Sequence, residues 1–322
     1  MHSIFSKAFC YGYWLQLRPY LFFISGISGL IGLSINPIEG WFRLFIAFVA
    51  FFLLFGFGQA LIDVFQIARD SLVSPNKPLC REAISKTQVF AVSSVGLLFC
   101  VAIFSVLNPL TFWIGLAGVM GLVAYTWFEK RWWGGLFWKS WIAATLPVIG
   151  FLCFEPSYEK IFLSEKLWAA MGSIFFSYSV FVLLGYYKDI SVNSRAGYNT
   201  FPVVFGWNAG LFISSCFLTL TFIFGFWLFV FKLMPAEFDP VFVLATVLWS
   251  SGIAFGAFAH RLMLRINRER LAHLAIIHAV RSFVLIHCGI VIALNPGLKW
   301  FILFFCLAFE YFIRARPEKS QI

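Results

Sequence analysis

Charged residues are scarce in this sequence of 322 residues, in which Asp, Glu, Lys and Arg together make up only 12%. A soluble domain carries about 25% of these residues, because its surface faces water. Hydrophobic residues make up 61% of the chain, and the mean hydropathy is +0.88. The polar surface is therefore too small for a soluble protein, and we expect lipid to cover much of the molecule.

Acidic residues are scarcer than basic ones, with 14 Asp and Glu against 24 Lys and Arg, which gives a net charge of +10. In a soluble protein this excess could indicate nucleic-acid binding. Here the basic residues lie between apolar segments, where membrane topology accounts for them. We therefore predict contact with membrane lipid and no nucleic-acid partner.

The sequence also lacks the short motifs of several kinds of site. Its seven cysteines are scattered, no two have the CxxC spacing, and most lie in apolar runs, so we infer neither a disulfide framework nor a zinc site. It contains no Walker, dinucleotide-binding, HExxH or nucleophile-elbow motif. Chemistry based on those motifs is therefore not expected.

Long apolar stretches are abundant, and ten of them are long enough to cross a membrane as helices. The predicted fold is therefore all-α, a polytopic membrane helical bundle of nine to ten transmembrane helices around a central cavity. The lower number allows for a short fifth stretch. The ten stretches lie near residues 17–36, 42–68, 88–107, 110–128, 138–154, 167–187, 208–231, 240–260, 273–294 and 297–313.

The basic residues are distributed unevenly between the two sides of this bundle. If the N-terminus is cytoplasmic and the spans alternate, the outer segments carry only Arg43, Lys160, Lys166, Lys232 and Lys299. This asymmetry agrees with the positive-inside rule. We therefore predict a multi-pass integral membrane protein whose longer polar loops are cytoplasmic, near residues 70–87, 129–139, 188–207 and 261–272.

Two polar segments lie at the predicted cytoplasmic ends of the second and sixth spans. Asp63, Gln66 and Asp70 have spacings of three and four, which place them on one helix face. Asp189 and Asn193 are four residues apart and would share a face if the sixth helix continues. Both segments could be solvated helix ends at the headgroups, but ionisable groups at membrane depth usually mark a functional site.

Two oxygen-rich helix ends on one membrane side can face each other across a bundle. Carboxylate and amide oxygens bind hard cations, and a bound Mg²⁺ can in turn bind a diphosphate. Basic side chains nearby could neutralise the remaining phosphate charge. The candidates for this role are Lys77, Arg81, Lys130, Arg131, Lys188 and Arg195.

The stretch Ile62–Asp70, followed by Pro75, Lys77 and Pro78, is similar to the motif N-D-x-x-D-x-x-x-D and its basic loop. Lys188–Gly206 matches K-D-x-x-x-D-x-x-x-G-x-x-T-x-P-V-x-x-G over a long and specific stretch. In these motifs the sequence resembles the UbiA superfamily of intramembrane prenyltransferases. The early Leu17–Pro19 and the basic loop Tyr125–Arg131 also look like that family. The resemblance weakens after about residue 210 and implies a single UbiA-like transmembrane domain over residues 1–322.

The sequence departs from the family at two of four metal positions. Carried over by position, the family's metal-binding acids would be Gln66, Asp70, Asp189 and Asn193, two of which are amides here. Asp63 is retained at a position that is less central to metal binding. An amide offers an oxygen but no charge, so we expect this site to hold Mg²⁺ more weakly.

The resemblance implies a Mg²⁺-dependent enzyme that moves an isoprenoid from a prenyl diphosphate donor to a lipophilic or aromatic acceptor. The metal and basic side chains would stabilise the departing diphosphate. Aromatic faces, for example those of Tyr125, Tyr187 and Tyr198, could stabilise the allylic cation. The residues that we expect to take part in catalysis are Asp70, Asp189, Lys188 and Tyr125.

Other functions are compatible with the same sequence. A membrane terpene cyclase of this superfamily would ionise the same donor without an acceptor. A non-catalytic lipid-binding protein built on the enzyme scaffold would account for the two missing acids. A transporter is less favoured, because we see no clear internal repeat.

Overall fold

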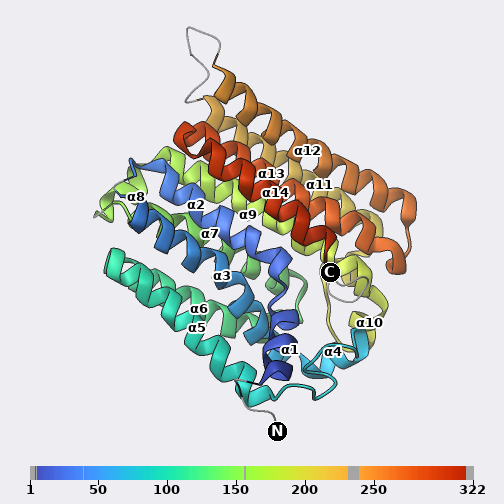
Figure 1. Cartoon of the computed structure of the whole chain (residues 1–322). Helices are drawn as coiled ribbons and strands as arrows, with labels where there is room; N and C mark the ends of the chain where they lie inside the picture. The colour runs from blue at the N-terminus through green and yellow to red at the C-terminus, as the bar shows by residue number, and fades with distance from the viewer. Residues whose placement is uncertain (1–3, 5, 39, 156, 231–238, 317–322) are drawn as a thin grey trace.

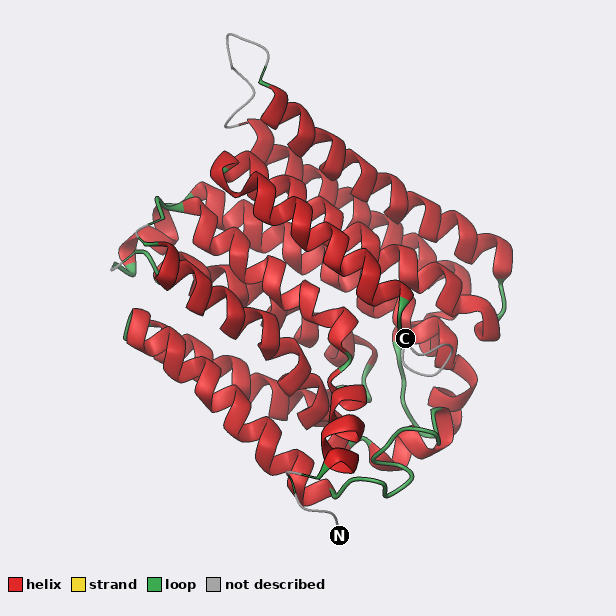
Figure 2. Ribbon diagram, in the orientation of Figure 1, coloured by secondary structure: helices red, strands yellow, loops and turns green. Residues whose placement is uncertain are grey.

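The computed structural model describes residues 4, 6–38, 40–155, 157–230 and 239–316, which form a bundle of long helices (Figures 1 and 2). Ten helical segments in these ranges are long and apolar enough to cross a membrane, which confirms the predicted all-α membrane bundle. The α-helices are α1 (Lys7–Leu17), α2 (Phe22–Ile35), α3 (Trp41–Phe65), α4 (Ile67–Val73), α5 (Lys86–Leu107), α6 (Thr111–Phe128), α7 (Trp132–Leu152), α8 (Glu159–Leu163), α9 (Glu165–Gly185), α10 (Ile190–Arg195), α11 (Phe201–Val230), α12 (Pro240–Ile266), α13 (Ala272–Leu294) and α14 (Lys299–Arg314).

Three spans begin six or more residues earlier than the sequence predicts. The first is broken, because α1 ends at Leu17, Arg18 adopts a left-handed conformation with φ 53°, and Pro19 opens a short 3-10 turn before α2. A residue that precedes proline is disfavoured in the α conformation, which ends the helix there. The fifth span begins at Trp132 rather than at residue 138, and the seventh begins at Phe201 rather than at residue 208.

Four helices, α2, α7, α9 and α13, form the centre of the bundle, because most of their residues are buried. Glycines bring α2 and α7 close together. A Cβ on Gly32 would lie 2.1 Å from the carbonyl oxygen of Pro147, and a Cβ on Gly150 would lie 2.3 Å from that of Gly29. In lipid, where apolar surface gives little driving force for association, such close contacts hold helices together.

The outer helices expose large apolar side chains, such as Phe99 of α5, Trp113 of α6, Val247 of α12 and Trp300 of α14. Lipid can cover this surface without cost, which agrees with the low charge of the chain. Charge between the central helix α13 and the outer helix α14 is neutralised locally. Arg281 of α13 donates to both carboxylate oxygens of Glu310 in α14, at 3.0 and 2.7 Å.

The two polar helix ends singled out from the sequence lie at the same end of the bundle. There α3 is followed by the short helix α4, and α9 is followed by a 3-10 turn (Tyr186–Asp189) and by α10. Figure 1 shows α4 and α10 side by side, and the two helices are in contact. The loops that connect this region are green in Figure 2.

Candidate active site

The second span ends in a bend that turns three polar side chains toward one cavity. Gln66 leaves the α conformation (φ −98°, ψ 8°), and its N–H is shared between the carbonyl oxygens of Ile62 and Asp63. The chain then resumes as α4, where the Asp70 N–H donates to the Gln66 carbonyl at 2.8 Å. Asp63, Gln66 and Asp70 all line the same pocket.

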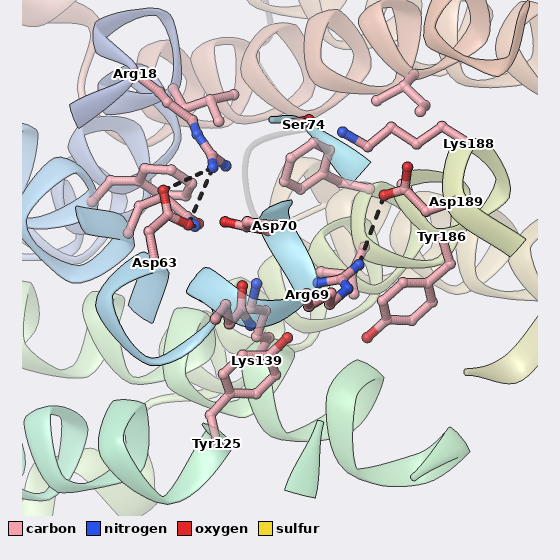
Figure 3. Close-up of a pocket in the computed structure, with 18 of the residues that line it drawn as sticks. Arg18, Asp63, Arg69, Asp70, Ser74, Tyr125, Lys139, Tyr186, Lys188 and Asp189 are labelled. Atoms are coloured by element: carbon pink, nitrogen blue, oxygen red, sulfur yellow. Dashed lines mark hydrogen bonds and ion pairs between the residues drawn. The ribbon is translucent and has the colours of Figure 1, made fainter. Parts of the chain in front are cut away.

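The sixth span ends in a similar change of conformation. After α9 the chain tightens into the 3-10 turn, and Asp189 (φ −128°, ψ 20°) joins this turn to α10. Lys188 and Asp189 line the same pocket as Asp70. The ends of spans two and six therefore converge, as Figure 3 shows from the side chains of Asp70 and Asp189.

The pocket has a cavity of about 140 Å³ and a lining that is positively charged. Its basic side chains outnumber its carboxylates by five to three. Such a lining favours an anion with several charges. The charged lining residues are Arg18, Arg69, Lys77, Lys139 and Lys188, together with Asp63, Asp70 and Asp189.

Asp63 is the most fully engaged of the three carboxylates. It is 1% exposed and accepts hydrogen bonds from Arg18 at 2.9 and 3.2 Å, from Gln59 at 2.9 Å and from Gln16. Lys77 approaches it at 3.7 Å. A buried carboxylate with so many donors is well stabilised in its charged form, so Asp63 fixes the Arg18 guanidinium at the pocket wall.

Asp70 is paired with Lys77 at a distance of 2.5 Å. Burial and the neighbouring charge of Asp63 raise the pKa of Asp70 above its usual value, although Lys77 acts in the opposite direction. Lys77 thus lies between the carboxylates of Asp63 and Asp70 and forms an ion pair with each of them. These two carboxylates hold the Lys77 ammonium group at the pocket wall.

Arg69 connects the two polar segments. Its Nε donates to Oδ1 of Asn193 at 3.0 Å, and its Nη2 lies 3.7 Å from Oδ2 of Asp189. The guanidinium carbon is 5.1 Å from the centroid of the Tyr198 ring. The Tyr198 ring and the side-chain oxygens of Asp189 and Asn193 therefore hold the guanidinium in the pocket wall (Figure 3).

Glu129, in the loop between α6 and α7, joins three separate parts of the site. It is buried, and it accepts hydrogen bonds from the Gln66 side chain and from the Tyr198 hydroxyl, the latter at 3.1 Å. Burial raises the pKa of Glu129. Burial and the adjacent Glu129 raise the pKa of Tyr198 to about 12. The Tyr198 hydroxyl therefore keeps its proton and donates to Glu129 at neutral pH.

Aromatic rings and a further cation form the opposite wall of the pocket. Tyr125 is 3% exposed, and the ammonium group of Lys139 lies 4.6 Å from the centroid of its ring. Tyr178 and Tyr186 also line the cavity. Aromatic faces stabilise positive charge. Because Lys139 already lies over the Tyr125 ring, Tyr178 and Tyr186 are the rings that remain for a cation or an apolar group.

An apolar chamber of about 60 Å³ adjoins the charged pocket and shares Phe55, Gln59, Lys139 and Tyr178 with it. Its remaining lining is almost entirely apolar. The two cavities together offer a charged end and an apolar end. The chamber is lined in addition by Ile24, Leu54, Ile62, Leu122, Ala143 and Leu146.

Several residues predicted from the sequence lie outside the described pocket lining. Arg81 donates to Asn76, Arg195 donates to the Ser191 carbonyl at 3.2 Å, and Arg131 lies over the Trp133 ring. Lys130 lies over the ring of Tyr198, which itself contacts the pocket residue Arg69 and donates to Glu129.

Tyr187, also predicted from the sequence to bind the substrate, is turned toward α11. It is fully buried, and its hydroxyl donates to the Trp207 carbonyl at 2.7 Å. Asn193, in contrast, is in contact with the pocket wall through Arg69. The structure therefore groups Asp63, Gln66, Asp70, Lys77, Tyr125, Lys188 and Asp189 around the cavity and leaves the remaining predicted residues at its periphery or beyond it.

Sequence reasoning missed Arg18, Arg69, Lys139 and Glu129 as site residues. Arg18 and Lys139 carried a usable signal, because a basic residue next to or within an apolar span needs a partner. Arg69 lies within the first motif at a position marked x, where the motif specifies no residue type. Glu129 gave no local signal, since its two partners lie 63 and 69 residues away.

The donor set around the cavity does not fit a metal site built from several acids. Across the described ranges, no three His, Cys, Asp or Glu side chains gather closely enough to hold a metal ion. Asp70 is paired with Lys77, and Oδ1 of Asn193 accepts from Arg69. The Gln66 side chain donates to Glu129. The residues at the family's four metal positions are therefore engaged mainly by cations or by other polar groups.

The fold and the site define a helical membrane protein with an ionic pocket that adjoins an apolar chamber. The model of the UbiA prenyltransferase family matches residues 21–280, and the chain therefore belongs to this family. A comparison with curated protein sequences gives no match.

Solved structures with the same fold include a UbiA homologue from Aeropyrum pernix K1, with a TM-score of 0.67 and 15% identity over 88% of this chain and 98% of that one. A UbiA homologue from Archaeoglobus fulgidus, solved with DMAPP and Mg²⁺, has a TM-score of 0.61 and 15% identity over 85% and 98%. A digeranylgeranylglyceryl phosphate synthase has a TM-score of 0.63 and 15% identity over 89% and 99%. At this identity the likeness concerns the fold.

Proposed function

We propose that this chain is an intramembrane prenyltransferase that binds a prenyl diphosphate in the charged pocket and transfers the isoprenoid to a lipophilic or aromatic acceptor. The observation that carries the proposal is the junction of a cationic pocket with an apolar chamber at the converging ends of α3 and α9. A prenyl diphosphate has the same two ends. Family membership and the Archaeoglobus structures with DMAPP or GPP and Mg²⁺ support the choice of donor.

Binding would place the diphosphate among the basic side chains. Arg69 and Lys188 flank Asp189, and Lys77 lies between Asp63 and Asp70. Charge-assisted hydrogen bonds from guanidinium and ammonium groups are the strongest available to phosphate oxygens. The carboxylates keep these donors apart and oriented, which lowers the cost of organising them when the ligand binds.

In the chemical step the bond between C1 of the isoprenoid and the bridging oxygen breaks, and both electrons remain with the diphosphate. The pocket cations stabilise this developing negative charge. The allylic cation lies toward Tyr178 and Tyr186, whose faces stabilise positive charge, because Lys139 already lies over the Tyr125 ring. The acceptor then forms a bond to C1 and loses a proton to the released diphosphate, which leaves a neutral prenylated product.

Mg²⁺ stays a prediction that comes from the family. It would have to compete with Lys77 for Asp70 and with Arg69 for Asp189. No step described above depends on the metal. The cytoplasmic position of the pocket and the single domain over residues 1–322 likewise stay predictions.

A product screen tests the proposed function. Purified protein would be incubated with prenyl diphosphates of several chain lengths, with and without aromatic and lipid acceptors, and diphosphate release and products would be measured by mass spectrometry. A prenylated acceptor is the expected result. Cyclic hydrocarbons formed without acceptor would indicate a terpene cyclase. No diphosphate release from any donor would favour a non-catalytic lipid-binding protein.

A further inference from the structure

We infer that Arg69 supplies, at the junction of the two motifs, the positive charge that a metal ion would otherwise supply, so that this pocket binds the diphosphate of its donor without a divalent cation. This inference rests on the proposed function, because it assumes a prenyl diphosphate ligand. It concerns how the diphosphate charge is neutralised.

The position of Arg69 is the first argument. The residue follows the bend at Gln66, on the short helix α4, and reaches both Asp189 and Asn193 of the opposite segment. Those two residues occupy the family's second set of metal positions. The guanidinium therefore lies where a cation has to lie in order to connect the two segments.

The charges at these positions are the second argument. Gln66 and Asn193 contribute no negative charge, and Arg69 adds a positive one. Mg²⁺ requires anionic or carbonyl oxygens that are free to face it. Here the Asn193 oxygen accepts from Arg69, and both Asp63 and Asp70 contact Lys77. The balance of charge therefore favours binding of an anion over binding of a metal cation.

The geometry of the guanidinium is the third argument. Among the residues described, Arg69 makes one normal hydrogen bond, to Asn193, whereas its approach to Asp189 at 3.7 Å is too long for a second one. Its cation–π contact with the Tyr198 ring helps to hold the guanidinium in place. Donors of the planar fork therefore remain for a phosphate group in the cavity, which is the geometry that arginine uses for phosphate.

Binding in the presence and absence of metal tests the inference. The full chain in detergent would be titrated with geranyl diphosphate by calorimetry, once with Mg²⁺ and once with EDTA. We expect dissociation constants that agree within about threefold. Binding that is lost in EDTA and restored by Mg²⁺ would overturn the inference and leave the proposed function intact. No binding in either buffer, with this donor or with longer ones, would refute the proposed function itself.

Arg69→Gln gives a second, independent readout. In EDTA this variant should bind geranyl diphosphate about 10- to 100-fold more weakly, because charge-assisted hydrogen bonds are lost. The matched control is Arg314→Gln, which removes an exposed guanidinium on α14 outside the pocket and should leave affinity unchanged. Equal affinities of Arg69→Gln and Arg314→Gln would contradict the inference. If Arg69→Gln does not fold, the metal comparison on the unaltered chain decides.

Discussion

Asp63 and Asp70 are both in contact with Lys77, but their surroundings give them different roles. Asp63 accepts from donors on α1 and α3 as well as from Arg18, and it is almost completely buried. Asp70 contacts Lys77 at the cavity, and its pKa is raised by burial and by Asp63. Asp63 therefore organises the wall of the pocket, whereas Asp70 is available to respond to a ligand.

Removing the Asp63 carboxylate should destabilise the protein. Asp63→Ala leaves the Arg18 guanidinium without its buried partner, and we expect a loss of about 3–5 kcal/mol in the free energy of unfolding. Thermal unfolding in detergent measures this loss. The control is the double variant Arg18→Met/Asp63→Leu, which removes both charges and should recover much of the stability. A double variant as unstable as Asp63→Ala would contradict the assigned role of the pair.

Restoring acids at the two amide positions should increase the dependence on Mg²⁺. Gln66→Asp/Asn193→Asp adds two carboxylates beside the cavity, and metal affinity rises with the number of charged ligands. We expect diphosphate release by this variant to rise about tenfold or more when Mg²⁺ is added, whereas release by the unaltered chain should change little. A Mg²⁺ titration of the variant and of the unaltered chain makes the comparison. Unchanged metal affinity would show that these positions do not face the bound diphosphate.

The residues of the site could be predicted from the sequence only in part. Asp70, Asp189 and Lys188 lie in motifs whose spacing marks them, and the structure brings them to one cavity. Arg69 and Glu129 depend on partners from distant segments, such as Asn193 and Tyr198, and no local spacing reveals these contacts. The pairing of cations with carboxylates is likewise a property of the folded chain.

At the scale of helices, hydropathy predicted where spans exist better than where they bend. The break before α2 could be expected from Pro19, since proline disfavours helix in the preceding residue. The bend at Gln66 has neither proline nor glycine beside it, so the sequence offers no signal for it. That bend nevertheless sets the direction of Arg69 and Asp70 (Figure 3).

The close approach of α2 and α7 gives a prediction at this scale. Gly32→Ala would place a methyl group against the Pro147 carbonyl, and we expect a loss of about 1–3 kcal/mol in stability from overpacking. Gly118→Ala on α6 is the matched control, because the added methyl group meets no atom within 4 Å among the residues described. Thermal unfolding of both variants in detergent tests this. Equal midpoints would mean that the two helices can separate without cost.

At the scale of the whole molecule, the charge asymmetry of the loops predicts which end of the bundle faces the cytoplasm. Ser194 lies beside the pocket end, and Glu159 lies on the short helix α8 between spans five and six. Because the positive-inside rule places the pocket end in the cytoplasm, Ser194→Cys should react with a membrane-impermeant maleimide only after permeabilisation. Glu159→Cys should react in intact cells.

Both cysteine variants would be made in a Cys10→Ser background, because Cys10 is exposed. Labelling is read by gel shift before and after permeabilisation. The reverse pattern would invert the topology and place the pocket on the outer side. The bundle itself would be unaffected by that result, since its helices follow from apolar length alone.

The pairing of Lys77 with Asp63 and Asp70, and of Arg69 with Asp189, has a consequence for selectivity. These carboxylates act as resident counter-anions, which an incoming ligand must outcompete for the same donors. Chloride or a singly charged phosphate ester gains too little from the exchange, whereas a diphosphate presents enough charge to draw the cations toward itself. The same ion pairs that hold the pocket lining together would thereby screen out the small anions abundant in water.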